Sequence, residues 1–139
     1  MNSRAGPYYW LTDATPLLSH SLQQMNLTDG LGPCPERISA LLSFISGGTF
    51  ALGPIGPQVG RRLRHVEEAR EMVAKVGSEQ MSIVLGVITG SNLLWSGDLE
   101  GARRSFGETL EPAVKAQAWW ADRCRIGVAL IAVARCRLE

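Results

Sequence analysis

Residues 90–106 read Gly-Ser-Asn-Leu-Leu-Trp-Ser-Gly-Asp-Leu-Glu-Gly-Ala-Arg-Arg-Ser-Phe, a pattern typical of two antiparallel helices that meet at a Gly-Asp turn. Gly97 can adopt the left-handed conformation that ends a helix, and the Asp98 carboxylate can cap the helix that follows. Gly90 and Ala102 offer small surfaces at which two helix backbones can cross closely. The apolar residues that fill the space between the helices are Leu93, Leu99, Phe106 and Leu110. This stretch therefore predicts a helix hairpin.

The same hairpin resembles one tetratricopeptide repeat, in which a small residue, a large apolar residue, a Gly-Asp-Leu turn, an Ala, an aromatic residue and a Leu follow in order. The matching positions here are Gly90, Leu93, Gly97-Asp98-Leu99, Ala102, Phe106 and Leu110. Gly86 stands where the family has a Trp early in the first helix. The resemblance covers about a quarter of the chain and implies a helical scaffold that binds other proteins.

Further helices are expected on both sides of this hairpin. Apolar residues at three- and four-residue spacing predict helices over residues 36–52, 58–76, 79–96, 98–111 and 122–138, with Pro112 as a boundary. Gly48 and Gly90 occupy similar places, which gives an internal period of roughly 40 residues, against 34 in the standard repeat. This longer period resembles the degenerate helical repeats that follow a signalling ATPase module in bacterial adenylyl cyclases and transcriptional activators.

Residues 1–35 differ from the rest of the chain because Gly, Pro and Asp interrupt them every few residues. They predict an irregular N-terminal segment in which Thr15-Pro16 could start a short helix that ends near Met25. Residues 36–139 then hold the repeats, and the last repeat is expected to be incomplete because its final helix lacks a return helix. That helix carries a dense apolar run, so self-association through it is expected. The run consists of Ile126, Val128, Leu130, Ile131 and Val133.

Composition indicates an ordinary globular chain without a strong excess of positive or negative charge. The 139 residues are 45% hydrophobic and 19% charged, and their net charge of +1 provides no overall field that would attract nucleic acid or anionic lipid. Cys34, Cys124 and Cys136 form no Cys-x-x-Cys pair, which favours reduced thiols and a cytoplasmic location.

Residue motifs that would indicate catalysis or cofactor binding are weak. Residues 53–60 are rich in Gly but lack the Gly-Lys-Ser/Thr of phosphate-binding loops, and two prolines there remove N–H donors. The basic residues at 61–64 are followed by Glu67, Glu68 and Glu71, which cancel much of their field. No nucleophile and base, and no set of metal ligands, stand at usable spacing. We therefore expect no catalytic residue, no cofactor and no metal.

The sequence thus predicts an all-α fold, a short tetratricopeptide-like solenoid, that acts as a non-catalytic protein–protein interaction module. By resemblance it would be a fragment or relative of the repeat region of a bacterial signalling or transcriptional regulator. Its partner would be a protein, a peptide or a neighbouring module. The resemblance implies a concave face lined by the first helix of each pair, and the candidate binding residues are Ser91, Asn92, Trp95, Trp119 and Trp120.

Two other classes of function remain open. A small helical membrane-associated protein is one, but the apolar runs at 38–52 and 81–95 are shorter than the roughly 20 residues that a span needs. An enzyme of unrecognised type is the other.

Overall fold

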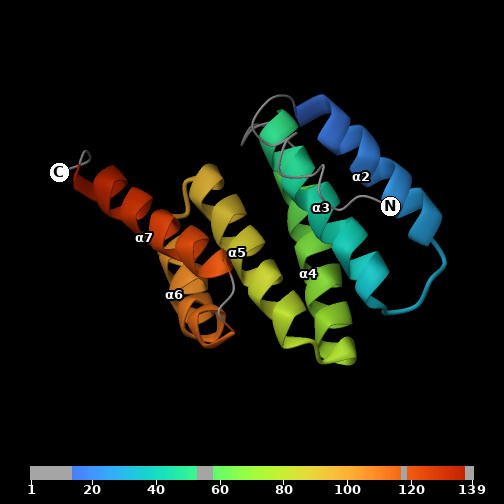
Figure 1. Ribbon diagram of the computed structural model, residues 1–139. Helices are drawn as coiled ribbons and strands as arrows, with labels where there is room; N and C mark the ends of the chain where they lie inside the picture. Colours follow the sequence, from blue (N-terminus) through green and yellow to red (C-terminus); the bar gives the residue numbers. More distant parts are fainter. Residues whose placement is uncertain (1–13, 53–57, 117–118, 137–139) are drawn as a thin grey trace. The chain divides into compact units, whose positions relative to one another are not determined.

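The computed structural model describes residues 14–52, 58–116 and 119–136, and every regular element within them is an α-helix. The helices in chain order are α2 (Ala14–Thr28), α3 (Pro35–Leu52), α4 (Gln58–Val76), α5 (Glu79–Ser96), α6 (Leu99–Lys115) and α7 (Trp120–Cys136) (Figure 1). The predicted all-α fold is confirmed. The expected turn at 53–57 and the first 13 residues lie outside the described residues.

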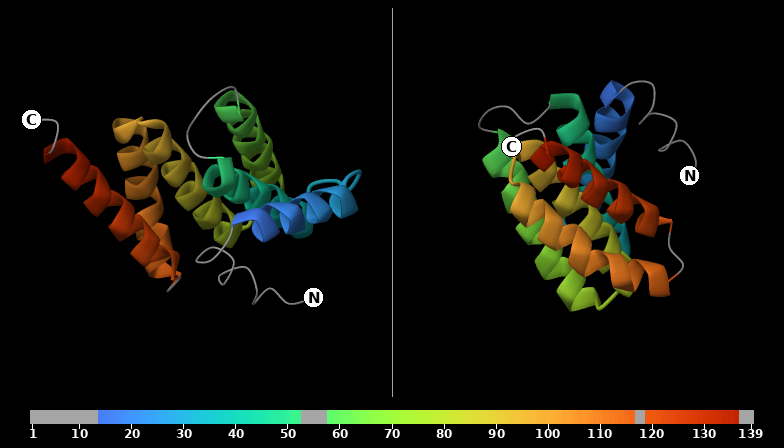
Figure 2. Two further views of the ribbon diagram at one scale, coloured as in Figure 1. Left: turned by 90° about the horizontal axis from the view of Figure 1, so that it is seen from above. Right: turned by 90° about the vertical axis from the view of Figure 1, so that its left-hand side faces the viewer.

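The chain divides into two compact units, at Met1–Val76 and Gly77–Glu139. In the first unit α3 packs against both α2 and α4. In the second unit α5 and α6 form a pair, and α7 lies along α6 with a smaller contact to α5 (Figure 2). Each unit is thus built mostly from helices that are neighbours in the sequence.

The predicted Gly-Asp turn joins α5 to α6. Gly97 has φ of 87° and ends α5 in the left-handed conformation, where its N–H reaches the Leu93 and Leu94 carbonyls. Asp98 caps α6, because its Oδ1 accepts a hydrogen bond from the Gly101 N–H at 2.9 Å. The start of α5 is capped in the same way, with the Ser78 hydroxyl accepting from the Met81 N–H. The hairpin therefore follows from its local sequence.

Phe106 forms the centre of the second unit. Its side chain is buried and lies between two glycines, Gly90 of α5 and Gly127 of α7. A Cβ added to Gly90 would lie 2.8 Å from Phe106 Cε1, and one added to Gly127 would come closer still to the other edge of the ring. The absence of a side chain at Gly90 therefore leaves room for the Phe106 ring. Ala102 is fully buried in the same cluster, which also contains Val87, Cys124 and Ile131.

Helices α5 and α6 also come close together at Gly86. A Cβ added there would overlap the side chain of Thr109. The Ser105 hydroxyl donates a hydrogen bond to the Gly86 carbonyl at 2.9 Å, which ties the two helices together by their polar groups. A bulky residue at this position would block that contact.

The first unit is held by an apolar face of α3 and by one arginine. Ile38, Leu41 and Ile45 of α3 are almost fully buried. Arg37 donates a hydrogen bond to the Thr28 carbonyl at 2.8 Å and pairs with Glu68 of α4 at 3.4 Å. It therefore links the end of α2 to α3 and α4.

Three helix boundaries differ from the prediction. Helix α2 spans 15 residues, longer than the short helix expected to end near Met25, and the carbonyl of its last residue, Thr28, accepts hydrogen bonds from the Leu31 N–H and from Arg37. Helix α6 continues through Pro112 to Lys115, so Pro112 is not a boundary. A proline removes one N–H, here the partner of the Glu108 carbonyl, and the exposed position of Glu108 lets water replace it. Helix α7 begins at Trp120 and not at Asp122.

Candidate protein-interaction surface

Helix α7 has two apolar faces, and α5 and α6 cover only one of them. The covered face carries Ala121, Cys124, Gly127 and Ile131, which recur every three or four residues and are buried. Three of these four residues are small. Because Gly127 has no side chain, the backbone of α7 can approach the Phe106 ring closely. Burial in this contact raises the pKa of the Cys124 thiol, because desolvation disfavours the thiolate.

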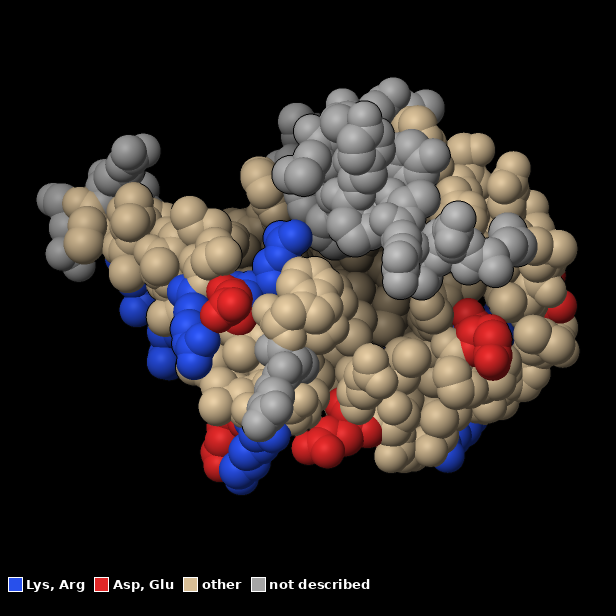
Figure 3. All heavy atoms as spheres, in the orientation of Figure 1, with Lys and Arg blue, Asp and Glu red and all other residues tan. Residues whose placement is uncertain are grey.

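The opposite face carries Ile126, Ala129, Leu130 and Val133, which we call the α7 stripe. Ile126, Leu130 and Val133 are 56%, 52% and 52% exposed, and they stand at positions i, i+4 and i+7 of the helix. Ala129 is exposed between them. Figure 3 shows a stretch of uncharged surface along α7 with the charged side chains gathered to one side of it. Of the five residues in the predicted apolar run, Ile131 alone is buried.

Charged residues lie at both ends of α7. Near its start, Arg125 pairs with Asp122 at 2.9 Å. Near its end, Arg135 hydrogen-bonds to Glu100 at the start of α6, and Glu100 also pairs with Arg103 on its own helix. Hydrogen bonds from Arg103 and then from Arg135 lower the pKa of Glu100 to about 2. Of these ion pairs, the exposed one between Arg135 and Glu100 joins the end of α7 to α6.

The two predicted tryptophans at the start of α7 do lie together. The rings of Trp119 and Trp120 stack with their centroids 3.9 Å apart, and the Arg123 guanidinium lies 5.6 Å from the Trp119 ring centroid. Trp120 also packs against the buried cluster of Ile83, Ala113 and Ala121, whereas Trp119 is exposed. Trp120 thus serves the core, and Trp119 extends the apolar surface at this end of α7.

The other three predicted binding residues lie on the second half of α5. The Ser91 hydroxyl and the Asn92 amide donate hydrogen bonds to the Val87 and Ile88 carbonyls of their own helix. Trp95 is exposed near the end of α5. Trp120 packs against the buried cluster that contains Ile83, which lies near the start of α5 and about 18 Å along the helix from Trp95 at 1.5 Å per residue. The five residues therefore do not form one cluster, and their role in binding stays a prediction.

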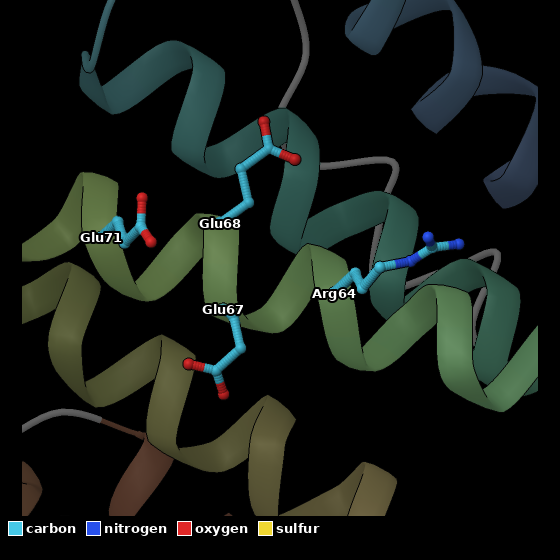
Figure 4. Close-up of a pocket in the computed structure, with 4 residues that line it drawn as sticks. All are labelled: Arg64, Glu67, Glu68 and Glu71. Carbon is cyan, nitrogen blue, oxygen red and sulfur yellow. The ribbon is translucent and has the colours of Figure 1, made fainter.

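A depression of about 380 Å³ on α4 is lined by Arg64, Glu67, Glu68 and Glu71. Figure 4 shows that Glu67 and Glu68 leave α4 on opposite sides and that Arg64 points away from both. Glu67 pairs with Arg70, and Glu68 with Arg37 and His65. Because Glu67 and Glu68 diverge and pair with side chains of their own unit, the depression lacks the convergent groups that a binding site for a small molecule requires.

No protein-family model, curated protein or solved structure matches the chain. Within the described ranges, no three His, Cys, Asp or Glu side chains are grouped so that they could hold a metal ion. None of the helices that the structure describes has both the length and the apolar character needed to cross a membrane. The α7 stripe exposes apolar side chains at helical spacing, and contiguous exposed apolar surface of this kind is typical of interaction sites.

Proposed function

We propose that this protein is a non-catalytic protein–protein interaction module of tetratricopeptide-like type, and that the α7 stripe is its docking surface. The observation that carries the proposal is the exposure of Ile126, Leu130 and Val133 on one face of α7. A helix that is apolar on both faces is normally buried on both, and contiguous exposed apolar surface marks interaction sites.

The surroundings of the stripe support the same function. Trp119 lies exposed at the start of α7, and aromatic side chains supply much of the binding energy in protein interfaces. Arg123 and Arg125 are exposed on the first turns of the helix and would belong to a polar rim. The resemblance of residues 90–110 to a tetratricopeptide repeat supports a scaffold that binds through its helix surfaces.

Photo-crosslinking of the full chain in the cells that naturally produce it tests this proposal. A photoreactive amino acid replaces Leu130 in one variant and Leu27, an exposed leucine of α2, in the control. We expect a discrete crosslinked product at position 130 that is absent at position 27. Adding Val133→Glu to the first variant should abolish the product. If position 130 gives no product under conditions in which the protein is present and folded, the proposed function is wrong.

A further inference from the structure

We draw no further inference here: the strongest candidate, the exposed α7 stripe of Ile126, Ala129, Leu130 and Val133, belongs to the docking surface already proposed, and nothing in the part of the chain that the structure describes shows what covers it.

Discussion

The substitution Gly90→Ala tests how the second unit is packed. The added Cβ would lie 2.8, 2.9 and 3.0 Å from Cε1, Cδ1 and Cζ of Phe106, each closer than carbon atoms normally approach. The ring cannot move away, because Gly127 of α7 touches its opposite edge. Overpacking of this kind costs about 1–3 kcal/mol. Alanine is better than glycine in a helix by about 1 kcal/mol, so the net loss of unfolding free energy should lie between about 0 and 2 kcal/mol.

Gly107→Ala is the matched control, because Gly107 lies on α6 next to Phe106 but has no atom within 4 Å of an added Cβ. It should raise the unfolding free energy by about 0.5–1 kcal/mol through helix propensity alone. Urea unfolding followed by tryptophan fluorescence measures both, since Trp95, Trp119 and Trp120 belong to the second unit.

The substitution Phe106→Leu tests whether the Phe106 ring causes the destabilisation by Gly90→Ala. In that background the cost of Gly90→Ala should disappear, with a coupling energy of about 1–3 kcal/mol in the double-mutant cycle. If Gly90→Ala stabilises the protein as much as Gly107→Ala does, the Phe106 ring is not held between Gly90 and Gly127 and this account of the core is wrong.

Three further perturbations test separate contacts. Ala102→Leu places a larger side chain in a fully buried position and should lower the unfolding free energy by about 1–3 kcal/mol; an unchanged thermal midpoint would contradict the packing of α6. Arg37→Met removes one of the two donors to the Thr28 carbonyl, which keeps the Leu31 N–H, and the donor to a Glu68 oxygen; it should cost about 0.5–1.5 kcal/mol, read from urea unfolding by circular dichroism. Because folding lowers the pKa of Glu100 to about 2 from an ordinary 4.5, its contribution to stability is complete above pH 4.5 and is lost as the pH falls toward 2. The difference in urea midpoint between the wild-type protein and Glu100→Gln should therefore shrink over that interval, and a constant difference would refute the ion pairs.

Local signals in the sequence were sufficient to predict the helix hairpin. Gly97 and Asp98 set the turn because one residue tolerates a positive φ and the other carries a short carboxylate, and both properties belong to the residues themselves. The bounds of α4 and α5 follow equally from the spacing of apolar residues and from the cap at Ser78. Such features need no knowledge of the rest of the chain.

Contacts between distant residues were not predictable in this way. Arg37 donates a hydrogen bond to the Thr28 carbonyl at the end of α2, nine positions earlier in the sequence. Arg135 of α7 donates a hydrogen bond to Glu100 of α6, which is 35 positions away in the sequence. An arginine in a helix has many acidic residues within reach along the chain, so the partner that it selects is decided by tertiary packing.

The candidate site shows the same limit for apolar residues. The sequence of α7 contains two apolar faces, and periodicity alone does not say which one packs against α6. The choice follows from size: the face with Ala121, Cys124 and Gly127 lets the backbone come close to the Phe106 ring, whereas a face with Ile126 and Leu130 would hold it away. Close packing therefore selects the face with small residues and leaves the larger apolar side chains outside. The same glycine that completes the core thus leaves the α7 stripe exposed.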